Sequence, residues 1–120
     1  MIKINCIKIA RHFYLYEFQC TCCNQVILNS DLLKRLVSLR DSINRPVYIN
    51  SGYRCQEENI RVGGAKNSYH RVGMAVDIRS KNITIPDLAI YADGVGFNGI
   101  GIYGTFLHLD IRPKKERWEG

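Results

Sequence analysis

The sequence predicts an α+β fold in which helices flank a small antiparallel sheet. Segments with apolar residues at helical spacing alternate along the chain with short, glycine-bounded segments that are typical of strands. No internal repeat, low-complexity tract or linker interrupts the 120 residues. Residues 1–120 are therefore expected to form a single domain, which is long enough to bury a hydrophobic core without cross-links.

The first two elements are a strand and a helix. Met1 to Ala10 alternates Ile with Lys and Asn, which is typical of a strand with one buried face. Residues 30–44 are expected to form a helix, because Ser30 can serve as its N-cap and Asp31 lies in its first turn. Leucines recur along this segment at helical spacing, and we assign them to the core.

Glycines and prolines bound the later elements. A run of β-branched and aromatic residues follows Pro46, and Gly63-Gly64 ends a short helix and opens a loop. In chain order we expect a strand over 46–50, a turn over 51–54, a helix over 56–61, a loop over 63–68, a strand over 73–78 that carries Asp77, a helix over 86–93, a glycine-rich connection over 94–101, and strands that carry Tyr103 and His108.

The net charge of the chain is +6, from 17 Lys and Arg against 11 Asp and Glu. This excess favours an anionic polymer as partner, and nucleic acid and bacterial cell wall are the two candidates. The basic residues are scattered and form no recognisable nucleic-acid-binding module, so we do not expect nucleic-acid binding. No apolar run approaches the roughly 20 residues that span a bilayer, and the N-terminus lacks the continuous apolar segment of a signal peptide.

The five cysteines leave at least one thiol unpaired if the chain is a fully oxidised monomer. The cluster Cys20-Thr-Cys22-Cys23 suggests a structural zinc site, which would need a distant partner such as Cys55 or Cys6 to complete tetrahedral coordination. Buried free thiols and a single disulfide are the alternatives. These interpretations, and the redox state of the thiols, stay open.

Three side chains that commonly bind metals, His70, Asp77 and His108, fall in two glycine-marked segments. A single histidine beside an apolar run is usually packed or on the surface, but here two of the three histidines in the chain accompany a carboxylate. Catalytic zinc sites commonly use three protein ligands and leave a fourth position for water. We therefore predict one zinc ion per chain, bound by these three residues.

Asp110 and Ser68 are candidate site residues next to these ligands. Polar and apolar residues alternate around His108, so His108 and Asp110 should share one face of a strand. Asp110 can orient that metal-bound histidine, or it can pair with Arg112 or Arg54 in a structural role. Ser68 can donate a hydrogen bond to a substrate backbone, or it is simply a turn residue.

The order and spacing of these motifs resemble those of the zinc D-Ala-D-Ala carboxypeptidase family, a group of peptidoglycan D,D-peptidases. This family shares its fold and metal site with the D-Ala-D-Ala dipeptidases and the Hedgehog signalling domain. The resemblance covers nearly the whole chain, and its start is that of the compact, phage-associated branch. The matching motifs are Glu17-Phe18-x-Cys20-x-Cys22-Cys23, Ser51-Gly52-Tyr53-Arg54, Asn59, Gly63-Gly64, Ser68-x-His70-x-x-Gly73-x-Ala75-x-Asp77-Ile78, Gly99-x-Gly101-x-Tyr103 and His108-x-Asp110-x-Arg112.

The resemblance implies a Hedgehog- or D,D-peptidase-like fold with His70, Asp77 and His108 as zinc ligands. It implies a metallopeptidase acting on peptidoglycan stem peptides through a metal-activated water, as a D-Ala-D-Ala carboxypeptidase or a cell-wall endopeptidase. Arg54 would hold the substrate or stabilise charge that develops on the scissile carbonyl, and Tyr103 would contact the substrate.

One position departs from the pattern of the related dipeptidases, which carry an acidic residue three positions before the last histidine ligand. This chain has Thr105 there. Asp110 or another carboxylate would then act as general base, or the metal would activate water without one, or catalysis would be impaired. The alternative function is a catalytically inactive zinc-binding module of the same fold that recognises cell wall or a protein. We expect a monomer without a signal peptide, made in the cytoplasm and delivered to the periplasm or cell wall by a phage-type route.

Overall fold

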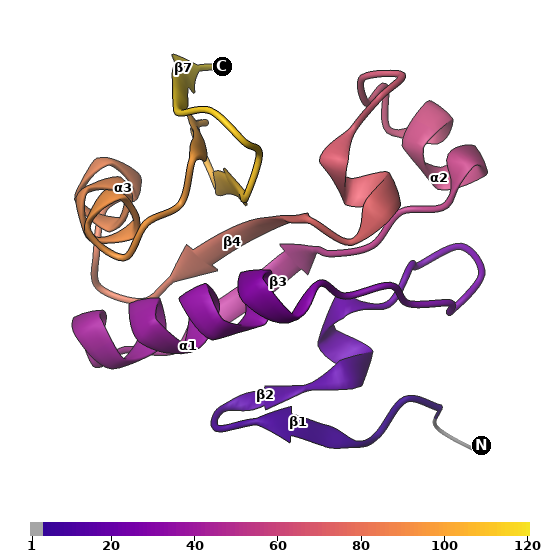
Figure 1. Cartoon of the computed structure of the whole chain (residues 1–120), viewed down its shortest axis with the longest axis horizontal. Coiled ribbons are helices and arrows are strands. Elements are labelled where there is room, and N and C mark those ends of the chain that lie inside the picture. The colour runs from indigo at the N-terminus through magenta and orange to yellow at the C-terminus, as the bar shows by residue number, and fades with distance from the viewer. Residues whose placement is uncertain (1–3) are drawn as a thin grey trace.

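The computed structural model describes residues 4–120 and confirms the α+β class (Figure 1). Residues 1–3 of the predicted first strand lie outside the described residues. In chain order the elements are β1 (Lys8–Ala10), β2 (Phe13–Tyr14), the 3-10 helix η1 (Leu15–Phe18), α1 (Ser30–Ile43), β3 (Val47–Ser51), α2 (Gln56–Arg61), the 3-10 helix η2 (Tyr69–Val72), β4 (Ala75–Ser80), α3 (Ile85–Gly94), β5 (Gly99–Ile102), β6 (Leu107–Asp110) and β7 (Glu116–Glu119).

The main sheet has five strands in the order β3-β4-β6-β5-β7. Its first four strands pair antiparallel, as predicted, but β7 runs parallel to β5. The chain reverses direction over residues 111–115 after β6 and continues on the far side of β5, so β7 takes the direction of β5. β5 begins at Gly99, inside the segment expected to be a connection. It ends before Tyr103, which lies in the turn to β6 and not in a strand.

The predicted helices are present, with small shifts at their ends. α1 begins at Ser30, but its N-cap is Asn29, one residue earlier than predicted. The Asn29 side chain accepts hydrogen bonds from the backbone N–H groups of Asp31 at 2.8 Å and Leu32 at 3.4 Å. Asn44 ends the helix with a φ of 50°, the left-handed conformation that Asn tolerates better than most residues. An asparagine therefore caps the helix at each end.

The hydrophobic core lies on one face of the sheet, against α1 and α3. On the strands, every second residue of β4 and β6 points to this face and is fully buried, namely Val76, Ile78, Leu107 and Leu109. On the helices, the buried residues recur at helical spacing, namely Leu32, Leu36, Leu39 and Ile43 in α1 and Leu88, Ala89 and Ala92 in α3. Because side chains alternate along a strand, Asp77 and His108 lie on the opposite face.

The N-terminal segment packs against the turn that follows β3. β1 and β2 form a hairpin whose turn contains His12, with a φ of 73°. Phe13 and Phe18 follow and are fully buried, with ring centroids 5.9 Å apart. The backbone N–H of Tyr53 donates to the Phe18 carbonyl at 2.8 Å, and a Cβ atom on Gly52 would lie 2.6 Å from that carbonyl oxygen. The segment around Phe18 is thereby fixed beside residues 52–55.

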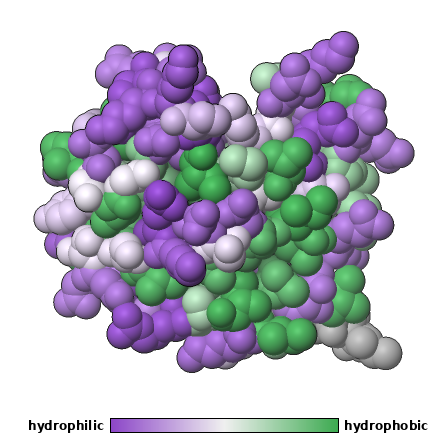
Figure 2. All heavy atoms as spheres, viewed as in Figure 1, coloured by the Kyte–Doolittle hydropathy of each residue, from purple (hydrophilic) through white to green (hydrophobic). Residues whose placement is uncertain are grey.

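The surface has a hydrophobic side and a hollow. Figure 2 shows hydrophobic residues gathered at the lower right and a hollow at the top, between the lobe around β7 and the lobe around α2. Exposed apolar side chains of the N-terminal segment include Ile7, Tyr14 and Tyr16. Within residues 4–120, each helix is too short or too polar to cross a membrane.

Candidate metal centre

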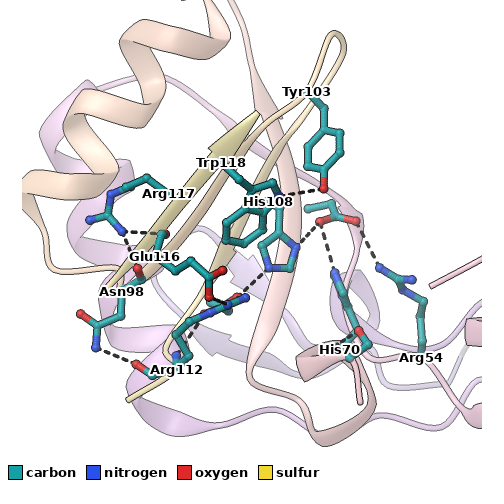
Figure 3. A network of polar contacts seen from close by, with 12 residues as sticks. Arg54, His70, Asn98, Tyr103, His108, Arg112, Glu116, Arg117 and Trp118 are labelled. Carbon is teal, nitrogen blue, oxygen red and sulfur yellow. Dashed lines mark hydrogen bonds and ion pairs between the residues drawn. The ribbon is translucent and has the colours of Figure 1, made fainter. Parts of the chain in front are cut away.

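His70, Asp77 and His108 come together on the polar face of the sheet. His70 lies on η2, Asp77 on β4 and His108 on β6, where the strand pairing places it directly opposite Asp77. His70 Nε2 is 3.2 Å from Asp77 Oδ1, and His108 Nδ1 is 3.0 Å from the same oxygen. The three ligand atoms lie within 4.8 Å of one another, and Figure 3 shows both histidines turned toward one point. The structure thus brings the three predicted metal ligands into one cluster.

Hydrogen bonds on the far side of each ring determine which nitrogen faces Asp77. His70 Nδ1 is 2.8 Å from the carbonyl oxygen of Gly52, which can only accept, so Nδ1 carries the hydrogen. His108 Nε2 is 2.8 Å from Asp110 Oδ2 and likewise donates. In the neutral rings the other two nitrogens then present lone pairs to a carboxylate oxygen. Three electron-pair donors that converge in this way require added protons or a cation between them.

The spacing of these atoms fits a tetrahedral zinc ion. Bonds of about 2.0–2.1 Å from zinc to nitrogen or oxygen place neighbouring ligand atoms about 3.3 Å apart. The separations of 3.0 and 3.2 Å to Asp77 Oδ1 are close to that value. Each histidine also donates its second nitrogen to a carbonyl or a carboxylate, which is how proteins orient metal-bound histidines. The residues present therefore fit zinc with one coordination position left for water.

Hydrogen bonds also shift the pKa values at this centre. Burial would raise the pKa of Asp77, but hydrogen bonds with His108 and His70 outweigh it and hold the pKa well below its usual range. Burial would lower the pKa of His108, but hydrogen bonds with Asp110 and Asp77 outweigh it and raise the pKa. Asp77 is therefore ionised at neutral pH, as a metal ligand must be.

Asp110 lies behind His108 and is fully buried. Its Oδ2 accepts from His108 Nε2 and from Arg112 Nη2 at 2.7 Å, while its Oδ1 accepts from Arg112 Nε at 2.8 Å. Burial would raise the pKa of Asp110, but the hydrogen bonds from Arg112 and His108 hold it below its usual range. These contacts match two roles considered for Asp110, orientation of His108 and an ion pair with Arg112. The role of general base stays a prediction.

Arg54 approaches the centre from the segment that follows β3. Its Nη2 is 3.4 Å from Asp77 Oδ2, and its Nη1 is 3.2 Å from Asn59 Oδ1. The side chain is largely buried, and within residues 4–120 its Nε has no hydrogen-bond partner. Arg54 therefore pairs with Asp77 and not with Asp110. It holds the Asp77 oxygen that faces away from the histidines, which leaves Oδ1 directed at the metal position.

Two glycines in β5 make room for the polar groups on this face of the sheet. Gly99 pairs with Asp110 and Gly101 with His108 in the strand register. A Cβ atom on Gly99 would lie 2.0 Å from Asp110 Oδ1, and one on Gly101 would lie 2.4 Å from the Trp118 ring. The Gly-x-Gly spacing thus leaves space for a buried carboxylate and an indole, while the intervening isoleucine faces the core.

A cavity of about 500 Å³ opens beside the cluster. Most residues of the segment 62–70 line one side of it. Five residues of β6 and its flanking segments and of β7 line the other side, namely Tyr103, Phe106, His108, Arg112 and Trp118. The hollow in Figure 2 lies between the same two parts of the chain. Ser68 lines the cavity, and its side chain also accepts from the backbone N–H of His70 at 3.2 Å, so Ser68 caps the helix that carries a ligand. Tyr103 lines it too: its ring stacks on Phe106 at 4.5 Å, and its hydroxyl accepts from Trp118 Nε1 at 2.9 Å.

Thr105 stands where related dipeptidases carry an acidic residue, and it contributes no side chain to this cavity. Thr105 is exposed in the turn between β5 and β6 and does not line it. Among the described residues that do, Asp77 is the only carboxylate, and both of its oxygens already have partners. These residues therefore include no free carboxylate to act as general base.

Apart from Tyr103, the aromatic residues that line the cavity were not predicted from the sequence. Tyr69, Phe106 and Trp118 all contribute to it. The Trp118 ring lies 5.3 Å from the His108 ring, and the Arg112 guanidinium lies 4.8 Å from the Trp118 ring (Figure 3). Trp118 reaches the site through β7, and the glycine opposite it in β5 was the one sequence signal that could have indicated a large neighbour.

Comparison with known sequences identifies the family. The profile described as Peptidase M15 matches residues 11–110. Peptidoglycan L,D-endopeptidase MepK of Escherichia coli is 33% identical over 92 residues, which are 71% of this chain and 50% of that protein. Probable peptidoglycan L,D-endopeptidase MepK of Haemophilus influenzae is 27% identical over 103 residues, which are 78% of this chain and 55% of that protein. The chain thus spans about half the length of these curated relatives. The resemblance to the zinc D-Ala-D-Ala carboxypeptidases is confirmed, and the chain belongs to the peptidase M15 family.

Proposed function

We propose that this chain is a zinc-dependent peptidase that cleaves a peptide bond in peptidoglycan. The observation that carries the proposal is the convergence of two histidine nitrogens and one Asp77 oxygen beside an open cavity. Membership of the peptidase M15 family supports it, as does the similarity to peptidoglycan L,D-endopeptidases. The net charge of +6 also favours an anionic polymer as substrate.

Each residue of the centre has a distinct task in this proposal. A bound zinc ion would supply an activated water and polarise the scissile carbonyl. His70, Asp77 and His108 hold it. Arg54 keeps Asp77 in place, and its positive charge next to the centre favours an oxyanion there without a direct contact. Asp110 orients His108 from behind.

We further propose that the bond cleaved is internal to the peptide. A carboxypeptidase needs a group that binds the terminal carboxylate, and a guanidinium is the most suitable one. Of the described residues that line the cavity, Arg54 and Arg112 carry guanidinium groups, and each is paired with a buried aspartate. Neither is free for a terminal carboxylate. The two relatives are named L,D-endopeptidases, which favours an L,D bond over the D,D bond that the motifs implied.

One observation favours a second candidate, an inactive zinc-binding module that recognises cell wall. The cavity offers no free carboxylate as base among its described residues. General base catalysis typically contributes about 10²- to 10⁴-fold to the rate. Loss of this factor would leave the metal site intact and hydrolysis slow or absent.

Zinc content and product analysis separate these functions. The wild type and His108→Ala are purified, their zinc is measured by mass spectrometry, and both are incubated with purified peptidoglycan. Products identified by mass show whether an L,D or a D,D bond is cut. His12→Ala is the matched control, because this third histidine is exposed in the β1–β2 turn.

The proposal predicts that His108→Ala loses one zinc per chain and all hydrolysis, while His12→Ala keeps both. Equal zinc content in the wild type and His108→Ala would refute the metal centre. Zinc bound through His108 without any hydrolysis would instead support the inactive module. Release of terminal D-alanine alone would contradict the proposed internal cleavage and restore the carboxypeptidase.

A further inference from the structure

A second group of metal-binding side chains lies outside the candidate metal centre. The Sγ atoms of Cys20, Cys23 and Cys55 lie within 4.8 Å of one another. Cys20 is fully buried, Cys55 is half-buried and Cys23 is exposed. Cys20 and Cys23 have the two-residue separation that is common among paired zinc ligands, and Cys55 comes from the segment before α2. Of the two distant cysteines considered from the sequence, the fold brings Cys55 here and not Cys6.

The distances fit a metal better than a disulfide. Cys20 Sγ and Cys55 Sγ are 3.6 Å apart, whereas a disulfide requires about 2.05 Å. Zinc–sulfur bonds of about 2.3 Å in a tetrahedron place neighbouring sulfurs about 3.8 Å apart. The observed separation is near that value, and the sulfur of Cys23 lies within 4.8 Å of both. A disulfide would use two of these thiols and leave the third without a function.

Backbone groups around the cluster are arranged to stabilise thiolates. The N–H of Cys55 points at Cys20 Sγ at 3.5 Å, and the N–H of Glu58 points at Cys55 Sγ at 3.5 Å. N–H groups directed at sulfur favour the charged form, which is the form that binds metals.

We propose that Cys20, Cys23 and Cys55 bind a second metal ion, a structural zinc. Cys22 lies next to Cys23 in the same exposed turn, but its sulfur is outside the group that lies within 4.8 Å, so its side chain would have to turn toward the ion to supply a fourth sulfur. With Cys22, four thiolates would give the closed coordination of a structural site, and without it a water would complete the coordination. Binding releases the thiol protons to solvent, so the affinity rises with pH.

The place of this site in the fold gives it a role. Cys55 follows Arg54 directly in the chain, and Cys20 lies two residues after Phe18, whose carbonyl accepts from Tyr53. A metal between Cys20 and Cys55 would cross-link the N-terminal segment to the segment that presents Arg54 to the candidate metal centre. The second ion would thus brace Arg54 without contacting the substrate.

Cobalt binding tests this proposal independently of any peptidase activity. The protein is purified with reductant, stripped of metal and titrated with Co²⁺, and the charge-transfer absorption from sulfur to cobalt is recorded. We expect two ions per chain in the wild type, one of them with the sulfur band. Cys23→Ser should lose that ion and its band; this side chain is exposed, so the variant is expected to fold. Cys6→Ser is the matched control and should keep both ions.

The double variant His70→Ala/His108→Ala separates the two sites. It should retain one cobalt ion with the full sulfur band, even if the proposed peptidase function is wrong. Circular dichroism establishes that each variant is folded, and Cys55→Ser provides a second test of the same ion. Absence of a sulfur band in the wild type, or an equal number of ions in the wild type and Cys23→Ser, would overturn the proposal. So would a disulfide between Cys20 and Cys55 in the reduced preparation.

Discussion

Asp110→Asn tests whether Asp110 positions His108 or takes a proton. Asp110 accepts from His108 Nε2 and from three groups of Arg112, namely its backbone N–H, Nε and Nη2. An asparagine of the same shape has one accepting oxygen, so its NH₂ group must face His108 or Arg112, and both are donors there. His108 consequently loses its charged acceptor, or its ring turns away from the metal position.

The size of the effect follows from the role of such partners. Replacement of a hydrogen-bond partner of a metal-bound histidine typically weakens metal binding by about 10- to 100-fold. At 1.36 kcal/mol for each factor of ten, this is about 1.4–2.7 kcal/mol of binding free energy. We expect the zinc dissociation constant of Asp110→Asn to rise by this factor, because Asp110 is fully buried and solvent cannot replace it.

The assay is a zinc titration against a competing chelator, followed by peptidoglycan hydrolysis at saturating zinc. Asp41→Asn is the matched control, since Asp41 forms an exposed ion pair with Arg11 at 2.6 Å, and it should bind zinc as the wild type does. If Asp110 only positions His108, Asp110→Asn should bind zinc more weakly than the wild type but recover its hydrolysis at saturating zinc. Unchanged zinc affinity together with lost hydrolysis would refute this reasoning and make Asp110 the general base.

Three further predictions concern stability. Leu36→Ala should lower the free energy of unfolding by about 2–5 kcal/mol in urea denaturation, because Leu36 is fully buried. Hydrogen bonds from Arg61 lower the pKa of Glu58 to about 2, so its ionised form stabilises the fold above pH 4.5 and less as the pH falls toward 2; Glu58→Gln should reduce the loss of Tm over this range. Gly99→Ala should destabilise by about 1–3 kcal/mol in thermal melts, because a Cβ atom would lie 2.0 Å from a buried carboxylate, whereas Gly104→Ala has no neighbour within 4 Å and should be tolerated.

The sequence was sufficient to predict elements, such as α1, that are determined by residues within their own segment. The helix over 30–44 was predicted because leucine spacing and polar end groups are properties of the segment itself, although the cap proved to be Asn29. The position of β7 depends on which sheet edge is free after β6 has paired with both β4 and β5. No pattern within residues 116–119 carries that information, so the parallel pairing could not be predicted.

The candidate metal centre also has features that the sequence predicts and features that only the fold determines. The ligand types and the shared face of His108 and Asp110 follow from composition and strand alternation, and the structure places them together. The partner of Arg54 was not predicted, because the sequence suggested Asp110 as a candidate, whereas the fold places Arg54 Nη2 3.4 Å from Asp77 Oδ2. The Gly52 carbonyl that orients His70 could not be predicted either, because every residue has a backbone carbonyl and the sequence does not show which one a histidine contacts.

The state of Asp77 determines how the two proposed functions can be distinguished. Its Oδ1 faces the histidines, its Oδ2 pairs with Arg54, and its pKa is held well below the usual range, so it is a poor acceptor for a proton from water. Hydrolysis would then rely on the metal and Arg54 alone, at a rate lower by about 10²- to 10⁴-fold than with a dedicated base. An inactive module would bind zinc through the same residues in the same geometry. Zinc affinity therefore tests the centre, and only the products formed over long incubations decide between a slow peptidase and a binding module.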